Sequence, residues 1–208
     1  MGVTYQWLMC TLNDSEQASL YPLYQQAISN ARIPEEEASV IHQWQSSLGN
    51  FPRHHISVEG EVRSNIDCDY FNRAFVVNSF QNLWKEISTP EGVNGFTLNE
   101  KNCFESLFLS RYSPAAGCWY VLGPENAQRL PAVWGNFWAS QDEVEELHAS
   151  ISDMLRNISV DKRAERISRI VDDTYAATKA YSMIDVILSC LESAVQENKG
   201  FFSLSSIG

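Results

Sequence analysis

The sequence predicts an α+β fold, a small and mostly antiparallel sheet covered by about six helices, in one domain spanning residues 1–208. Three observations lead to this prediction. The chain opens with an alternating apolar pattern, closes with a helix, a glycine and an apolar strand, and has 208 residues of which 44% are hydrophobic. That proportion supports a buried core and is too high for a disordered chain. Residues 124–139 mark either a sub-boundary or a structured loop within the domain, and we favour the loop.

The first expected element is a strand over Val3–Cys10. Successive side chains of a strand point to opposite faces, and apolar residues occupy every second position of this segment. The other face is also partly apolar, because it includes Leu8 and Cys10. We therefore expect a strand that is covered on both sides.

Two helices are expected next. Asp14 and Gln17 have the spacing of a capping box, in which two side chains satisfy backbone N–H groups at a helix start. This helix extends to about Arg32 with an interruption at Pro22, because proline is tolerated only in a first turn. The second helix starts at Pro34, and three glutamates follow in its first turn.

The middle of the chain alternates apolar segments with turn residues. Apolar spacings of three and four indicate helices, and short apolar runs bounded by glycine and proline indicate strands. The expected elements are a strand or hairpin over His54–Val62, a helix over Asp69–Ile87, a loop over Thr89–Gly95, a helix over Asn99–Arg111, a turn over Ser113–Gly117 and a strand over Cys118–Leu122.

A further helix is expected from Ser140 onwards. Ser140 and Glu143 have the S-x-x-E spacing of a capping box. Glu145 and Glu146 follow in the first turns, where the helix dipole favours carboxylates. Apolar residues then recur at spacings of three and four along one face. They are Val144, Leu147, Ile151, Met154, Leu155 and Ile158.

The chain closes with a helix and a strand. Apolar residues from Tyr181 to Val195 repeat at helical spacing, and Gly200 is expected in the left-handed position that ends a helix. Phe201–Ile207 then forms a short apolar strand. We expect this strand to pair within the sheet, so that the two ends of the chain meet there.

Three segments together carry a family resemblance. The opening MGVTYQWLMCTLND, the W-x-x-F-W-x-S-x-x-E-V-E-E-L segment from Trp134, and the closing helix, NKG and strand resemble the YfbM-like family of small bacterial proteins. The resemblance covers the first dozen residues and roughly Trp134 to Gly208, and the middle of the chain departs from it. It implies an α+β fold, no known activity and no catalytic residue.

The chain is strongly acidic, with 26 aspartates and glutamates against 15 lysines and arginines and a formal net charge of -11. Phosphate backbones repel such a chain, so we do not expect a nucleic-acid partner. The charge suits a basic protein partner, and solubility alone is the alternative explanation.

The cysteines indicate a reducing compartment. There are five, none is in a C-x-x-C pair, and Cys190 is one of several inside apolar runs. We expect buried, reduced thiols in a cytoplasmic protein. The start of the chain does not have the pattern of a signal peptide, and no apolar run has the length of a bilayer span. We therefore expect no membrane partner.

Familiar catalytic and cofactor motifs are absent from the sequence, including G-x-x-x-x-G-K-[ST], G-x-G-x-x-G, G-x-S-x-G and H-E-x-x-H. His54 and His55, with Asp67, Cys68 and Asp69 downstream, are residue types that ligate metals. Adjacent strand residues point to opposite faces, however, so the two histidines do not easily share one ion.

Cys118 is the cysteine least typical of a core. It lies between Gly117 and Trp119, and G-C-W occurs near the nucleophile of papain-like proteases. The longer signature of those proteases is missing, so we expect Cys118 to be a strand residue packed inward. The sequence assigns no catalytic residue, cofactor or metal.

Two acidic clusters lie at expected helix starts, where capping and a solvated face account for them. The alternative is a docking surface for a basic partner, in which nearby tryptophans provide binding hot spots. Glu143 is excluded from this surface, because the capping box uses it. The candidate partner-binding residues are Trp134, Trp138, Asp142, Glu145, Glu146, Glu35, Glu36 and Glu37.

These observations favour a non-enzymatic, cytoplasmic protein-binding module. The most specific version is a bacterial immunity or antitoxin-type protein that neutralises a basic toxin. The alternative is an enzyme or small-ligand binder whose site combines distant residues around His54, His55 and Cys118. A homodimer formed through an exposed aromatic surface is the third hypothesis.

Overall fold

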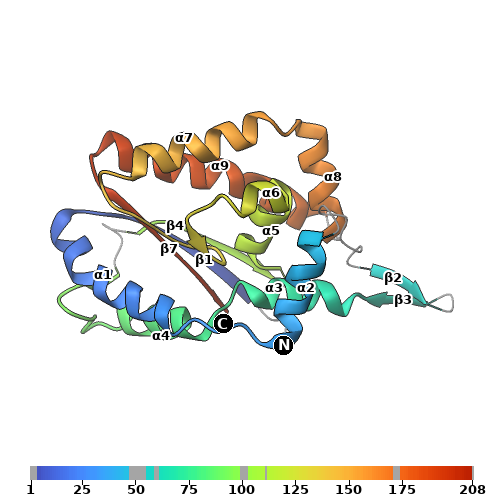
Figure 1. The fold of residues 1–208 in the computed structure, drawn as a ribbon, viewed down its shortest axis with the longest axis horizontal. Coiled ribbons are helices and arrows are strands. Elements are labelled where there is room, and N and C mark those ends of the chain that lie inside the picture. The colour runs from blue at the N-terminus through green and yellow to red at the C-terminus, as the bar shows by residue number, and fades with distance from the viewer. Residues whose placement is uncertain are drawn as a thin grey trace.

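The computed structural model describes residues 4–46, 55–58, 61–98, 103–110, 112–170 and 174–207. A five-stranded antiparallel sheet carries helices on both faces, and a separate hairpin extends away from it (Figure 1). The strand order is β4-β1-β7-β6-β5, which confirms the predicted α+β class. The strands are β1 (Thr4–Leu12), β2 (His55–Val58), β3 (Glu61–Ser64), β4 (Cys103–Ser110), β5 (Ala132–Val133), β6 (Asn136–Ala139) and β7 (Gly200–Ile207).

The described part of the chain contains nine helices, against about six expected. α1 and α4 contact one face of the sheet, whereas α5 and α9 contact the other and α7 packs on α9 (Figure 1). The helices are α1 (Asp14–Ser29), α2 (Glu35–Ser46), α3 (Ile66–Ala74), α4 (Asn78–Ile87), α5 (Pro114–Leu122), α6 (Pro124–Ala127), α7 (Val144–Arg156), α8 (Val160–Ile170) and α9 (Thr174–Gln196).

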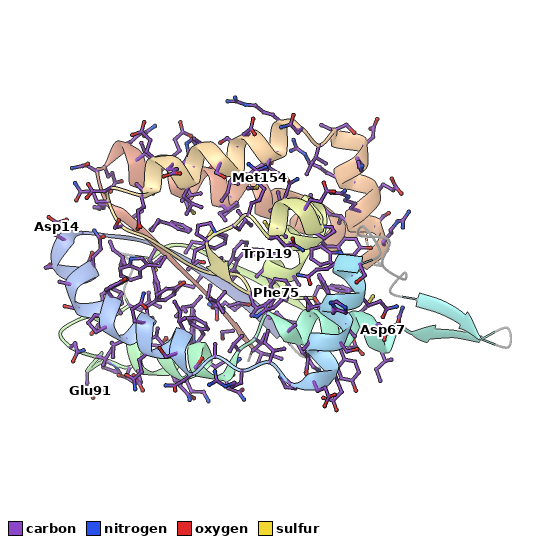
Figure 2. All side chains as sticks on the ribbon, in the orientation of Figure 1. Asp14, Asp67, Phe75, Glu91, Trp119 and Met154 are labelled. Atoms are coloured by element: carbon purple, nitrogen blue, oxygen red, sulfur yellow. The ribbon has the colours of Figure 1, made fainter. Side chains whose placement is uncertain are left out.

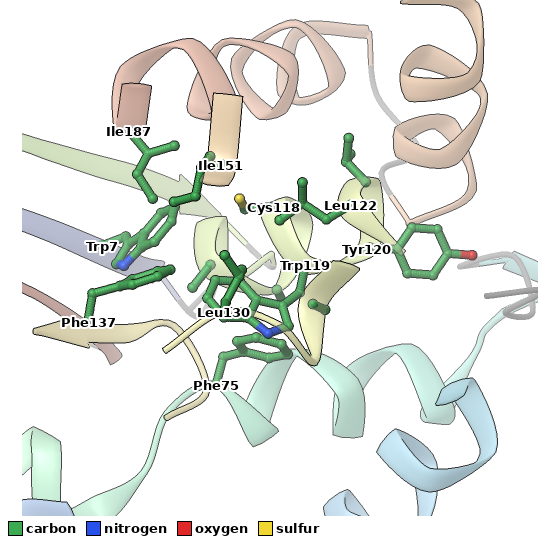
Figure 3. Packing of buried hydrophobic residues seen from close by; sticks show 14 of the residues in the cluster. Trp7, Phe75, Cys118, Trp119, Tyr120, Leu122, Leu130, Phe137, Ile151 and Ile187 are labelled. Atoms are coloured by element: carbon green, nitrogen blue, oxygen red, sulfur yellow. The ribbon is translucent and has the colours of Figure 1, made fainter. Parts of the chain in front are cut away.

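Both faces of the sheet are buried, as the sequence predicts for the first strand. Trp7 of β1 belongs to the core cluster formed with α5, α7 and α9, whereas Leu8 belongs to the cluster formed with α1 and α4. The buried rings of Trp7, Trp119 and Phe137 contact one another within the first cluster (Figure 3). Each face thus has its own apolar layer, and the sheet separates the two.

β7 brings the two ends of the chain together. It lies between β1 and β6, and its pairing places Leu204 opposite Leu8 and Phe202 opposite Trp138. The predictions that the closing strand pairs within the sheet and that the two ends of the chain meet there are therefore confirmed.

The turn before β7 uses a different residue from the expected one. Asn198, with a φ of 54°, takes the left-handed position, and Gly200 is the first residue of β7. Asparagine enters this region more readily than most residues. Gly200 matters for another reason, because a Cβ there would lie 2.7 Å from the side chain of Gln17 and 2.9 Å from the carbonyl oxygen of Ala139.

The helix predicted over Asn99–Arg111 is wrong for residues 103–110, which form β4. This strand pairs along β1, with Leu109 opposite Tyr5 and Leu107 opposite Trp7. A short apolar segment has no strong preference of its own, and pairing with a buried strand outweighs a weak helical spacing.

The strand predicted over Cys118–Leu122 is also wrong, because these residues belong to α5. Ser113 caps this helix by accepting a hydrogen bond from the Ala116 N–H at 3.2 Å, and Pro114 lies in the first turn. Both are ordinary signals of a helix start. Every residue of α5 is buried, so the helix has no polar face and its sequence shows no helical periodicity.

Between α2 and β4 one prediction is confirmed and one is corrected. The hairpin is present as β2 and β3, and its Glu59-Gly60 turn lies outside the described residues. The single helix expected over Asp69–Ile87 is two helices, because Val77 has an extended backbone with a ψ of 126° and separates α3 from α4.

The start and the middle of α1 also differ from the prediction. The capping box is formed by Asn13 and Glu16, one residue earlier than the expected pair of Asp14 and Gln17. α1 also continues through Pro22 without a break. Pro22 is exposed, so the backbone carbonyl that loses its helical partner can be hydrated.

A two-residue turn joins β5 to β6 and is held by buried polar groups. Trp134 and Gly135 have φ values of 50° and 83°, as a tight hairpin turn requires. The Gly135 carbonyl accepts hydrogen bonds from Trp7 Nε1 at 2.8 Å and from Ser203 Oγ at 3.0 Å. A Cβ at Gly135 would lie 2.5 Å from the Cβ of Ala115. The turn is therefore fixed against the sheet and against α5.

Asn136 extends the pairing between β6 and β7. The backbone register between these strands covers only Trp138 and Ala139. Beyond them, Asn136 Oδ1 accepts a hydrogen bond from the Ser205 N–H at 2.9 Å, and its Nδ2 donates to the Val133 carbonyl at 2.8 Å. A buried side chain thus replaces backbone bonds and sets the position of β6.

Replacing Asn136 with alanine should lower the free energy of unfolding by about 2–3 kcal/mol, because the buried Ser205 N–H loses its acceptor. Urea denaturation followed by tryptophan fluorescence measures this loss. Asn157→Ala is the matched control: Asn157 is exposed and its amide donates to the Asp153 carbonyl, so we expect a cost below about 0.5 kcal/mol. Equal costs for the two variants would contradict the role given to Asn136.

Candidate functional site

A hollow of about 650 Å³ lies between α1 and the β5–β6 hairpin, and we call it the α1 groove. From Gln17 to Ile28 its wall follows α1 for about 16 Å. One wall consists of Gln17, Ala18, Tyr21, Tyr24, Gln25 and Ile28, and the other of Pro131, Ala132, Val133, Trp138, Ser140 and Glu143.

A second hollow of about 280 Å³ lies between β6 and α7, and we call it the α7 groove. It shares Pro131, Trp138 and Glu143 with the α1 groove. The two grooves therefore meet at an aromatic ring and a carboxylate. The remaining lining residues are Arg129, Ala139, Glu146, Leu147 and Ser150.

Trp138 is held in place by aromatic rings from α1 and β7. Its ring centroid lies 5.2 Å from that of Tyr21, 5.4 Å from that of Tyr24 and 5.9 Å from that of Phe202. Tyr24 is buried, and its hydroxyl donates to the Asn136 carbonyl at 2.9 Å. Tyr21 is 46% exposed. The result is an ordered aromatic surface, partly open to solvent, on a rigid base.

Glu143 lines both grooves together with Trp138, although its expected use in the capping box predicted no part in docking. Its Oε2 accepts hydrogen bonds from the Ser140 N–H at 2.9 Å and from the Ser140 hydroxyl at 2.7 Å. Of the two hydrogen bonds of the predicted capping box, only the one from the Ser140 N–H to the Glu143 carboxylate forms. The Ser140 hydroxyl donates to the same carboxylate, and α7 begins at Val144. The two bonds from Ser140 hold the pKa of Glu143 below its usual range, so the carboxylate is charged at neutral pH.

Carboxylates from two helix starts lie close together, and two of them, Glu143 and Glu146, line the grooves. The start of α1 and the start of α7 lie at the same end of the molecule, where the Gln141 N–H donates to Gln17 Oε1 at 3.3 Å (Figure 1). Figure 2 shows Asp14 at this end. We call this surface the acidic end, and it consists of Asp14, Glu16, Asp142, Glu143, Glu145 and Glu146.

Trp134 does not join Trp138 in one patch. Its ring packs on Phe75 at a centroid distance of 5.9 Å. It lines a separate hollow of about 270 Å³ together with Trp44 and Trp119. The two tryptophans of the predicted docking surface therefore line different hollows.

The glutamates of α2 lie far from the acidic end. α2 is at the opposite end of the molecule from the starts of α1 and α7, close to the labelled Asp67 (Figures 1 and 2). Glu35 and Glu36 are exposed, whereas Glu37 is only 9% exposed. Burial removes Glu37 from any docking surface, and Glu35 and Glu36 form a separate charged site.

The structure gives no support to a cysteine nucleophile at Cys118. This side chain is buried among apolar groups of α5, α7 and α9 (Figure 3), and burial raises its pKa to about 12. A protonated, buried thiol is inert at neutral pH. Cys118 thus faces inward as expected, from a helix instead of a strand.

His54 lies outside the described residues, as does the side chain of His55. Within the described ranges, no group of three or more histidine, cysteine, aspartate or glutamate side chains is arranged to hold a metal ion. No helix in these ranges combines the length and apolar character of a membrane span.

Comparison with protein-family models, with curated proteins and with solved structures finds no match to this chain. The resemblance to the YfbM-like family stays a prediction.

The Ser140–Glu143 contact should make stability depend on pH. A carboxylate whose pKa is lower in the folded than in the unfolded chain stabilises the fold above its unfolded pKa and loses this effect as pH falls through the folded pKa. Because Glu143 is exposed and solvent screens its charge, Glu143→Ala should cost no more than about 1 kcal/mol at pH 7. The difference from the parent should shrink towards zero below about pH 4.

Denaturation of parent and variant over this pH range provides the measurement. Glu86→Ala is the control, because Glu86 is exposed near the end of α4 and should change stability little at either pH. A cost of Glu143→Ala that stays constant from pH 7 to pH 3 would show that the contact with Ser140 does not stabilise the charged form.

Proposed function

We propose that this protein is a non-enzymatic protein-binding module that docks a basic protein over the α1 groove and the acidic end. One observation carries the proposal: the partly exposed rings of Trp138 and Tyr21 line the same groove as Glu143, and further carboxylates lie at the starts of α1 and α7. Binding surfaces commonly combine central aromatic anchors with a charged rim.

The charges of the acidic end are available to a partner. Asp142, Glu145 and Glu146 are exposed. In the described part of the chain the ion pairs are Arg169–Glu165 and Lys199–Glu197, and neither involves these three carboxylates. Together with the net charge of -11, they create a negative potential that attracts basic surfaces and repels acidic ones. Such complementarity accelerates association and selects among partners.

The aromatic side chains add binding affinity that the carboxylates alone do not provide. Exposed ion pairs contribute only about 0–1 kcal/mol each, so a rim of carboxylates by itself gives weak binding. Tyr21 and Trp138 offer rigid rings whose burial by a partner adds affinity. Trp138 is already ordered by Tyr24 and Phe202, so its immobilisation on binding costs little entropy.

The most specific form of this proposal is a bacterial immunity or antitoxin-type protein that neutralises a basic toxin. A cytoplasmic location belongs to the same proposal. Toxins that act on nucleic acids present basic surfaces to phosphate backbones. A small acidic protein with an aromatic groove is suited to cover such a surface and block the approach of the substrate.

Replacing Glu145 and Glu146 with lysine should weaken partner binding at least tenfold, because like charges would then face the basic surface. The partner is captured from the source cells at low salt, identified, purified and titrated by calorimetry against each variant. Stability should change little, since both side chains are exposed.

The matched control is Glu35→Lys with Glu36→Lys, which makes the same charge change at the start of α2. It should leave the affinity within about twofold of the parent, apart from the small effect of net charge. Capture of a protein from the source cells does not by itself support the proposal; the affinities of the variants do. If the two double variants lose the same affinity, or neither loses any, the acidic end is not the docking surface.

A further inference from the structure

We propose that the α1 groove seats an arginine side chain of the basic partner, with its guanidinium stacked on the rings of Tyr21 and Trp138 and hydrogen-bonded to Glu143. The inference rests on the proposed function, because it names the group through which a basic protein is recognised. Three features of the groove support it: its aromatic surface, its carboxylate and the absence of cationic side chains among the described residues that line it.

The aromatic surface fits a planar cation. The rings of Tyr21 and Trp138 are 5.2 Å apart between centroids and inclined at 49°, so they leave no slot between them and instead form an angled platform. A guanidinium placed over such a ring is attracted by its negative face. Tyr21 is 46% exposed, and the platform is therefore accessible from solvent.

Glu143 presents an open acceptor in the same groove as this platform. Both hydrogen bonds from Ser140 go to Oε2, and in the described part of the chain no hydrogen bond is recorded for Oε1. The bonds from Ser140 also fix the direction of the carboxylate. A cation that reaches Oε1 meets a charged and oriented acceptor, which gives a stronger hydrogen bond than a neutral one.

The other residues that line the two grooves favour the α1 groove over the α7 groove as the site of the arginine. No lysine, arginine or histidine is among the described residues that line the α1 groove, and Pro131 and Val133 provide apolar contacts for the methylene stem of an arginine. The α7 groove contains Arg129, which repels a second cation. The arginine is therefore expected on the α1 side of Trp138.

The arrangement distinguishes arginine from lysine. A guanidinium is planar, weakly hydrated and carries several N–H donors, so it can stack on a ring and donate to a carboxylate at the same time. A lysine ammonium is compact and strongly hydrated, and it gains less from the rings. A site that recognised charge alone would bind arginine and lysine with equal affinity.

Hexa-arginine amide and hexa-lysine amide, which carry equal charge, are the probes. Each is titrated into the isotope-labelled protein at low salt, and the indole N–H resonance of Trp138, assigned by its loss in Trp138→Phe, reports binding. Hexa-arginine should bind with a Kd at least fivefold lower than that of hexa-lysine. Tyr21→Ala and Glu143→Gln should each reduce the preference to less than twofold.

Two control variants separate the proposed contacts from general effects. Tyr21→Phe keeps the ring and should keep the preference for arginine. Glu36→Gln removes the same charge as Glu143→Gln at the opposite end of the molecule and should leave both affinities unchanged.

Equal affinities for the two peptides, or a preference that survives Tyr21→Ala and Glu143→Gln, would overturn the arginine seat. Neither result contradicts the proposed function if Glu145→Lys with Glu146→Lys still weakens binding of the purified partner protein at least tenfold. If neither peptide shifts any resonance of the acidic end and that double variant also binds the purified partner as tightly as the parent does, the arginine seat and the proposed function both fail.

Discussion

The attachment of β6 to β7 is the constraint on which the candidate site depends. Backbone pairing between these strands covers two residues, and the Asn136 side chain continues it with hydrogen bonds to Ser205 and Val133. The Gly135 carbonyl adds bonds from Trp7 and Ser203. A short strand held mainly by buried polar side chains has little tolerance for change. Its position decides where the next residues of the chain lie.

Trp138 connects the attachment of β6 to β7 with the surface of the molecule. Its backbone pairs with Phe202 of β7, and its ring rests on Tyr21 and Tyr24 of α1. The Tyr24 hydroxyl donates to the Asn136 carbonyl. α1 is therefore linked to the β5–β6 hairpin by a hydrogen bond as well as by the ring contacts. The α1 groove is consequently a rigid feature of the fold, which suits recognition of a fixed surface with little loss of entropy.

Sequence patterns predicted the elements whose periodicity is unambiguous, such as the first strand, α2 and the closing strand. They failed where tertiary context decides, as in β4, which is a strand because β1 pairs with it, and in α5, which is buried on all sides. Of the candidate site, Trp138, Glu145 and Glu146 were identified from local signals. Glu143 was excluded, because the capping box was expected to use it. Tyr21 was missed, because nothing in the sequence connects it to Trp138.

Hydrogen–deuterium exchange of the protein with and without its captured partner tests the central claim most directly. If a basic protein docks over the α1 groove and the acidic end, the partner should slow exchange in residues 13–25 and 131–147 and leave α2 and α3 unchanged. The first of these segments contains Tyr21, and the second contains Trp138 and Glu143. Protection confined to α2, α3 or the β2–β3 hairpin would contradict the claim and place the binding surface at the opposite end of the molecule.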